Sequence, residues 1–286
     1  MKIGFVGQGW IGKNYANDFE ERGYDVVRFA LEEPYVKNKK AIKTCDITFV
    51  AVPTPTTKDG FNYDILRNVL KLIGNGKVAV IKSTVLPEVT DMLQEEYPLI
   101  YLLHSPEFLT EATASFDSKN PDRNIVGIPD KFKDDEKHRE RAQAVMKVLP
   151  YAPYSLICSA KEAAFIKYGG NNWFYFKVLF INMLYDLVKA SGEDISWETI
   201  RDGMAADHRI GRTHLDPIHK SGRGAGGHCF IKDFEAFRNL YDDIVGEPMG
   251  EQILAMLANK NMKYLKDSNK DIDLLEGVYG KDIINE

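Results

Sequence analysis

The stretch "KIGFVGQGWIG" (2–12) is the clearest structural signal in the chain, because it joins a short apolar strand to a glycine turn and the start of a helix. In such turns the first glycine permits the tight bend, the second lets a pyrophosphate approach the backbone, and the third lets helix and strand pack closely. The helix N-terminus also attracts the anion. This context predicts a dinucleotide-binding domain. The expected contacts are Gly7, Gln8, Gly9, Trp10, Ile11 and Gly12.

Strands and helices alternate through the first half of the chain. Apolar strands are expected at 24–30, 46–55, 77–85, 99–109, 124–129 and 154–159, and helices at 11–22, 62–73, 87–95 and 133–148. This alternation predicts a Rossmann-type, doubly wound parallel sheet. Ligands bind such sheets beyond the carboxyl ends of the strands, where Thr54, Thr84 and Glu107 are expected.

The pattern changes after about residue 159. The stretch that follows has no strand signal, and apolar residues recur through it at helical spacing, which predicts one long helix buried on several sides. Further helices are expected at 196–206, 233–244 and 250–266. We therefore predict an α/β domain at 1–158 and an all-helical domain at 159–286. The long helix is too apolar to face water all round, so we expect a homodimer.

Composition excludes several classes of protein. The net charge of −5 over 286 residues argues against a bulk attraction to nucleic acid. No apolar run reaches the ~20 residues needed to span a bilayer, and no signal peptide is recognisable, so a cytoplasmic protein without a membrane partner is expected. Three cysteines without a pairing pattern indicate reduced thiols.

The end of the second strand, "RFALEE" (28–33), bears on the choice of cofactor. Ala30 and Leu31 stand where an acidic residue usually holds the ribose hydroxyls, and Glu32 or Glu33 could substitute for it. No arginine follows the strand to receive a 2′-phosphate. We therefore expect NAD rather than NADP.

A glycine-rich stretch, "SGRGAGGHCFIKD" (221–233), leads into Cys229. One interpretation is a flexible surface turn beside an inert cysteine, since free cysteines are commonly buried. The other is a loop that wraps a ligand and presents a nucleophilic thiolate. The following Lys232 and Asp233 favour the second.

Two further features of the sequence bear on its chemistry. Lys167 and Asn171 share one face of the long helix, and their aromatic surroundings argue against a solvated edge, so an oxyanion is a candidate partner. The other feature is a scatter of histidines whose spacing is too irregular for a metal site, so no metal is expected. They are His104, His208, His214, His219 and His228.

Six motifs together resemble the UDP-glucose/GDP-mannose dehydrogenase family. In order they are "GQGWIG", "VAVPTPT" (50–56), "KSTVLP" (82–87), "SPEFLTEATASFDSKNPDRNIVG" (105–127), "EAAFIKYGGNN" (162–172) and "ADHRIG" (206–211) with "GAGGHCFIKD" (224–233). The resemblance runs from residue 1 to about 265. The family normally continues with a second Rossmann-like domain that binds the nucleotide base, and no second glycine fingerprint follows here. A minimal two-domain form is therefore expected.

The resemblance implies an NAD-dependent oxidation of the C6 alcohol of a nucleotide sugar, with UDP-glucose as the expected substrate, to the uronic acid. Cys229 would attack the intermediate aldehyde to give a thiohemiacetal, and a second oxidation would give a thioester that water hydrolyses. Lys167 and Asn171 would stabilise the oxyanion.

Other roles come from the same resemblance. Asp233 and Thr84 would orient the hydrolytic water, Glu107 would take part in proton transfer, and Arg209 would reach the sugar across a dimer interface. The implied cofactor contacts are Val52, Pro53, Thr54, Pro55, Thr56, Ser83, Thr84, Glu111 and Lys232. The implied substrate contacts are Glu107, Phe108, Leu109, Glu111, Lys167, Asn171, Arg209, Gly224, Ala225 and Gly226.

Two other functions stay open at this point. Without a third domain the chain could bind NAD as a weakly active or inactive scaffold, because remote binding energy holds a substrate at the reacting centre. It could also oxidise a smaller hydroxy acid, although single-step alcohol oxidation needs no thiol.

Overall fold

The computed structural model describes residues 1–192 and 194–284. The chain forms two compact units, one from Met1–Thr54 and Asn62–Lys167, the other from Pro55–Phe61 and from Tyr168 onward. The expected domain boundary after residue 158 lies at the start of the long helix, whereas the two compact units divide inside that helix.

The first unit is built on a seven-stranded sheet of order β2-β1-β3-β6-β7-β8-β9. Its strands are β1 (Lys2–Val6), β2 (Asp25–Phe29), β3 (Ile47–Val50), β6 (Val78–Ile81), β7 (Tyr101–His104), β8 (Arg123–Ile128) and β9 (Tyr154–Ser159). The predicted doubly wound α/β sheet is confirmed, with one correction. β8 runs antiparallel to β7, while every other neighbouring pair in this sheet is parallel.

The antiparallel direction of β8 has a local cause. A parallel pair needs a crossover connection, usually a helix that packs along the sheet. The connection from β7 to β8 holds only the short η2 (Glu111–Thr113) and α4 (Ala114–Asp117), and α4 contacts α1 (Trp10–Glu21). The chain therefore returns along β7 instead of crossing over.

Helices cover both faces of this sheet. The remaining helices of the unit are η1 (Val36–Thr44), α2 (Asp64–Leu70), α3 (Val89–Glu96), η3 (Asp130–Phe132) and α5 (Glu136–Val148). The chain moves from β1 to β2 in one direction and from β3 through β6 to β7 in the other, so right-handed crossovers place α1 and the pair α2 and α3 on opposite faces. Residues of α1 and α5 share one core cluster with the strands, around Phe5, Phe19 and Phe49. The reversal between β1 and β3 leaves the crevice in which dinucleotides bind such sheets.

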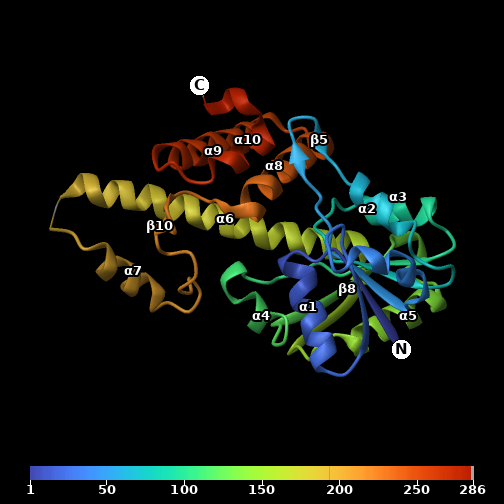
Figure 1. Cartoon of the computed structure of the whole chain (residues 1–286). Helices are drawn as coiled ribbons and strands as arrows, with labels where there is room; N and C mark the ends of the chain where they lie inside the picture. Colours follow the sequence, from blue (N-terminus) through green and yellow to red (C-terminus); the bar gives the residue numbers. More distant parts are fainter. Residues whose placement is uncertain (193, 285–286) are drawn as a thin grey trace. The chain divides into compact units, whose positions relative to one another are not determined.

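The second unit is helical, with α6 (Ala160–Ser191) crossing into it, followed by α7 (Trp197–Ala205), α8 (Gly227–Ile244), α9 (Pro248–Asp267), α10 (Ile272–Tyr279) and η4 (Lys281–Ile284). The unit also contains two small antiparallel hairpins. One pairs β4 (Thr56–Thr57) with β5 (Gly60–Phe61), and the other pairs β10 (Ile218–His219) with β11 (Gly222–Arg223). In Figure 1, α8, α9 and α10 lie together, and each contacts the other two. Tyr175 of α6 stacks on Phe234 of α8 with ring centroids 3.9 Å apart, and both residues belong to one of this unit's core clusters.

None of the helices in the described ranges combines the length and apolarity that a membrane crossing requires.

Candidate active site

The glycine turn after β1 has the geometry of an anion cradle. Gly7 has φ +90°, and a Cβ there would lie 2.2 Å from the carbonyl oxygen of Ala51. A Cβ on Gly12 would lie 1.9 Å from the carbonyl oxygen of Gly7, so strand and helix pack at backbone contact. Gly9 is different, because a Cβ there would meet nothing within 4 Å. Gly9 is also the N-cap of α1 and supplies no side-chain cap, so the residues fit a diphosphate placed over the helix N-terminus.

The segment after β2 offers no buried acidic side chain for a ribose. Leu31 is 82% exposed, and Glu32 and Glu33 lie on the surface beside it. Arg28 points the other way, with its guanidinium 2.6 Å from the Glu20 carboxylate and 2.8 Å from the Asn17 amide oxygen. This arginine is therefore committed to α1 and is not placed to receive a 2′-phosphate.

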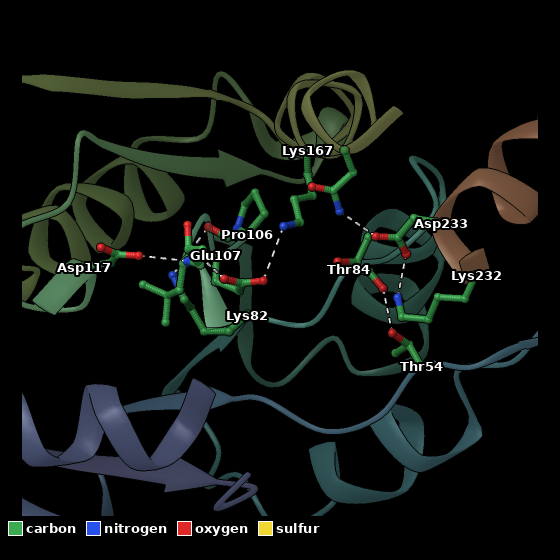
Figure 2. Close-up of polar contacts among 12 residues, drawn as sticks. Thr54, Lys82, Thr84, Pro106, Glu107, Asp117, Lys167, Lys232 and Asp233 are labelled. Atoms are coloured by element: carbon green, nitrogen blue, oxygen red, sulfur yellow. Dashed lines mark hydrogen bonds and ion pairs between the residues drawn. The ribbon is translucent and has the colours of Figure 1, made fainter. Parts of the chain in front are cut away.

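Buried hydroxyls tie together the ends of β3 and β6. The Ser83 hydroxyl donates to the Val52 carbonyl at 2.6 Å and accepts from the Val52 amide at 3.1 Å. The Thr54 hydroxyl donates to the Thr84 carbonyl at 2.7 Å (Figure 2). These side chains shape the edge of the sheet, so any contact to a cofactor falls to the backbone and to the half-buried Thr84.

The expected cofactor segment 52–56 is divided between the compact units. Val52, Pro53 and Thr54 belong to the first, whereas Pro55 and Thr56 belong to the second and lead into the β4–β5 hairpin.

A buried ion pair lies just beyond β7 in the first unit. Lys167 and Glu107 are 4% and 3% exposed, and the ammonium lies 3.3 Å from the carboxylate (Figure 2). The other oxygen of Glu107 accepts from the Leu109 amide at 2.7 Å. Two cations lie near the Phe108 ring, whose centroid is 4.0 Å from the Arg123 guanidinium and 5.6 Å from the Lys167 ammonium. The structure thus brings together Glu107, Phe108 and Lys167, while Glu111 is exposed on η2.

Lys82 is a second buried lysine in this region, and it was not among the expected site residues. Its ammonium lies 3.4 Å from the Ser105 hydroxyl, 3.5 Å from the Pro106 carbonyl and 4.5 Å from the centre of the Tyr15 ring. Burial lowers the pKa of Lys82 to about 7, with Glu107 opposing this effect and Lys167 adding to it. Lys82 stands at the carboxyl end of an expected strand, directly before Ser83 and Thr84, and this position in the sequence could have marked it as a candidate site residue.

In the second unit, Asp233 of α8 is held by two donors. The Asn171 side-chain amide donates to one carboxylate oxygen at 2.6 Å, and the Lys232 ammonium lies 2.5 Å from the other (Figure 2). Asp233 is 1% exposed. Cys229 lies four residues earlier on α8, hence on the same helix face, and it is half-buried in the first turn, where a helix favours negative charge. The structure therefore gathers Asn171, Asp233 and the helix of Cys229.

The glycine loop, residues 222–227, is ordered by the chain that follows α9. A Cβ on Gly222 would lie 2.4 Å from the Ser268 hydroxyl, and one on Gly226 would lie 2.0 Å from the Asp271 carboxylate. Ala225 and Asn261 exchange two hydrogen bonds, at 2.7 and 2.9 Å. These contacts favour a packed loop over a flexible surface turn. Gly222, Gly224 and Gly226 are therefore needed for close packing against the chain itself, a reason that was not expected from the sequence.

Two expectations concern the loop after α7. The side chain of Arg209 is 80% exposed and its guanidinium lies 2.6 Å from the Asp207 carboxylate, so within one chain it is a surface residue. His214 stacks on Phe174 with ring centroids 4.7 Å apart. Within the described residues, no three His, Cys, Asp or Glu side chains gather as a metal-binding group.

Fold and glycine turn together define a Rossmann-type dinucleotide-binding protein with a helical second unit. The comparison with protein families agrees with this class. Residues 35–148 match the NAD binding domain of the UDP-glucose/GDP-mannose dehydrogenase family, and residues 161–261 match its central domain. The chain belongs to this family. The first match also supports NAD as the cofactor, as expected from the sequence.

The curated relatives carry the corresponding name. UDP-glucose 6-dehydrogenase of Bacillus subtilis is 29% identical over 257 residues, which cover 86% of this chain and 55% of the relative. UDP-glucose 6-dehydrogenase of Rickettsia typhi is 31% identical over 216 residues, which cover 70% of this chain and 46% of the relative. The chain thus spans about half the length of these relatives.

Solved structures share the fold. A UDP-glucose dehydrogenase from Pyrobaculum islandicum superposes with a TM-score of 0.76 at 24% identity, over 96% of this chain and 70% of that one. The 3-hydroxyisobutyrate dehydrogenase of Mycobacterium tuberculosis superposes with a TM-score of 0.70 at 15% identity, over 99% of this chain and 98% of that one. At these identities the likeness concerns the fold alone.

Proposed function

We propose that the protein oxidises the C6 alcohol of a nucleotide sugar, with UDP-glucose as the expected substrate, to the uronic acid. The observation that carries this proposal is the hydrogen bond from Asn171 to the buried Asp233 carboxylate, one helical turn from Cys229. A thiol beside a fixed carboxylate and a fixed amide suits chemistry on a covalently held carbonyl group better than a single oxidation step.

The alcohol loses a proton and a hydride to become an aldehyde, and the Cys229 sulfur then bonds to the aldehyde carbon. The oxygen of this thiohemiacetal passes through an oxyanion that Asn171 and Lys167, one turn apart on α6, would stabilise as donors. Loss of a second hydride and a proton gives a thioester, and water cleaves it to the acid and the free thiol. NAD+ held at the glycine turn would accept the hydride in each oxidation.

The protein's own carboxylates would handle water and protons. Asp233 is fixed by Asn171 and Lys232, so its carboxylate would orient the water that attacks the thioester. Glu107 would take part in proton transfer, and its pairing with Lys167 would hold the carboxylate in place. Thr84 would assist in placing the water.

The remaining expected contacts belong to the same proposal. Cofactor contacts would come from Gly7–Gly12, from 52–56, and from Ser83, Thr84, Glu111 and Lys232. Substrate contacts would come from Glu107–Leu109, Glu111, Lys167, Asn171, Gly224–Gly226 and, in a dimer, Arg209.

The homodimer is proposed to form through α6. Trp173, Phe180 and Leu187 recur at a spacing of seven residues and are 65%, 56% and 63% exposed in the single chain. Two helical turns separate successive members, so the three form one apolar stripe. Lys177, which lies between Trp173 and Phe180 in α6, donates to the Ile210 carbonyl at 2.8 Å, so the neighbouring Arg209 would lie near a second copy that buried this stripe.

The function is tested by stoichiometry. The purified protein is mixed with NAD+ and each of a panel of UDP- and GDP-sugars, and absorbance of NADH is followed. Two NADH per sugar oxidised, with the second lost in Cys229→Ser, is the expected outcome. The absence of any NADH, alongside measurable binding of NAD, would instead support a scaffold that binds the cofactor.

A smaller hydroxy acid is the second candidate substrate. The observation in its favour is that this chain and a 3-hydroxyisobutyrate dehydrogenase superpose over nearly the full length of both. One NADH per substrate molecule, undiminished by Cys229→Ser, would identify this simpler reaction.

A further inference from the structure

The turn between α9 and α10 grips the glycine loop that precedes Cys229. We call residues 268–271 the tail turn. The Ser268 hydroxyl accepts from the Arg223 amide at 3.0 Å, at one end of the glycine loop. The Asp271 carboxylate accepts from the Gly227 amide at 2.7 Å, at the other end. The tail turn thus contacts both ends of a loop about forty residues earlier in the chain, as well as its middle.

Lys270 supplies the contact in the middle. Its ammonium donates to the Gly224 carbonyl at 3.0 Å and lies 3.4 Å from the Gly222 carbonyl. Lys270 is 4% exposed, and burial lowers its pKa, while the neighbouring Asp271 opposes this effect. A buried lysine needs such partners, because an unpaired ammonium inside a protein is costly.

Asp271 has two unusual properties. It is the N-cap residue of α10, yet its side chain makes no capping bond to that helix. Instead it bonds to the first residue of α8, whose own N-cap, Gly226, has no side chain with which to cap it. Asp271 also has φ +53°, a left-handed conformation that favours glycine. A carboxylate is therefore kept at a position where the backbone would prefer glycine.

We propose that Lys270 and Asp271 are positioning residues for Cys229. Lys270 holds the carbonyl side of the glycine loop, and Asp271 caps the helix turn that carries the thiol. Cys229 is two residues beyond Gly227 in that same turn. By holding the Gly227 amide, Asp271 would therefore help to fix the position of the sulfur, and its charge would affect the reactivity of the thiol. The Gly227 amide already donates to Asp271, so a substrate diphosphate would have to bind other groups of the chain.

The proposal rests on the proposed function only for its relevance to catalysis, so its test uses neither NAD nor sugar. Asp271→Gly removes the carboxylate and relieves the left-handed backbone, which favours folding. Asn269→Gly is the matched control, because Asn269 also has a left-handed φ, of +51°, and is exposed in the same turn. The readout is the rate at which iodoacetamide alkylates Cys229, followed by mass spectrometry of its peptide.

We expect Asp271→Gly to raise this rate at least fivefold and Asn269→Gly to change it less than twofold. Amide hydrogen exchange of residues 222–229 should accelerate in the first variant and not in the second. A rate within twofold of wild type in Asp271→Gly, with unchanged exchange, would overturn the proposal.

Two further variants separate the contributions. Asp271→Asn keeps an acceptor for the Gly227 amide and loses the charge, so it should retain slow exchange while its alkylation profile moves to lower pH. Lys270→Met should accelerate exchange at 222–226, which supports the proposal even if Asp271→Gly folds poorly.

Slow exchange in Lys270→Met, together with an unchanged pH profile of alkylation in Asp271→Asn, would contradict the proposal. If sugar oxidation fails in every variant and in the wild type while these results hold, the proposed function is wrong and the positioning role stands.

Discussion

Asn171 of α6 and Asp233 of α8 share a 2.6 Å hydrogen bond inside the helical unit. The carboxylate is almost completely buried and has a second donor in Lys232. A buried carboxylate with two charged or polar donors has its hydrogen bonds satisfied in the folded state. Removing one donor leaves part of the desolvation free energy of the carboxylate uncompensated.

This relationship predicts a stability cost at Asn171. Asn171→Ala should lower the free energy of unfolding by about 1–3 kcal/mol, because the buried Asp233 carboxylate loses one of its two hydrogen-bond donors. Urea unfolding measures the change. Asn239→Ala, on the exposed face of α8, should stay within about 0.5 kcal/mol of wild type. Equal costs at both sites would show that the hydrogen bond contributes nothing specific.

The second prediction concerns Glu107 and its two lysines. Glu107→Gln should cost more stability than Lys167→Met, because the first leaves both Lys82 and Lys167 without their carboxylate, whereas the second leaves Glu107 with Lys82 nearby. Breaking a buried pair from one side typically costs about 3–5 kcal/mol. Chemical denaturation of the two single variants and the double variant gives the coupling energy, and additive costs would contradict a shared ion cluster.

The lowered pKa of Lys82 predicts that the free energy of unfolding rises with pH above neutrality. The unfolded lysine keeps its proton up to its ordinary pKa of 10.5, but the folded one releases it at about 7. Between these values the unfolded chain binds more protons, so stability increases with pH. Between pH 7 and 9 the gain should be roughly 2–3 kcal/mol, and Lys82→Met should remove it. A slope that is the same in the variant would assign the effect to another group.

The glycine turn predicts different outcomes for two similar substitutions. Gly12→Ala should destabilise the protein, since its Cβ would clash with the Gly7 carbonyl oxygen. A Cβ on Gly9 would lie more than 4 Å from any other part of the protein, so Gly9→Ala should lower the thermal midpoint less than Gly12→Ala, and only by the small cost of alanine at an N-cap. Its methyl group would lie where a diphosphate is expected, so NADH should bind about tenfold more weakly, or roughly 1.4 kcal/mol. Unaltered NADH binding in Gly9→Ala would show that the diphosphate lies elsewhere.

The apolar stripe on α6 predicts a self-association that one charge would abolish. Trp173→Glu should convert a dimer to a monomer in sedimentation velocity experiments, because burying an unpaired carboxylate in an interface is costly. Tyr151→Glu is the control, since Tyr151 is 86% exposed in the other compact unit. A wild-type chain that sediments as a monomer at all concentrations would contradict the proposed dimer.

Local patterns were enough to predict most of the secondary structure. The glycine turn, β9 (expected at 154–159) and α1 (expected at 11–22) lie close to their expected bounds. The strands expected at 46–55 and 99–109 end five residues earlier, at Val50 and His104, and α8 begins six residues before the expected residue 233. Such features depend on side-chain periodicity and on turn chemistry between near neighbours in the chain, which a sequence displays directly. The family could be recognised for a similar reason, since its motifs are short and lie at the ends of these elements.

Tertiary structure alone revealed the features that depend on residues distant in the chain. The sequence does not show that Lys82 lies against Ser105 and Tyr15, and its lowered pKa follows from that burial. Nor does it show that Gly226 must be glycine because Asp271 occupies the adjacent space. These contacts arise when separate elements pack, and the cost or benefit of each polar group then depends on which neighbours exclude water from it.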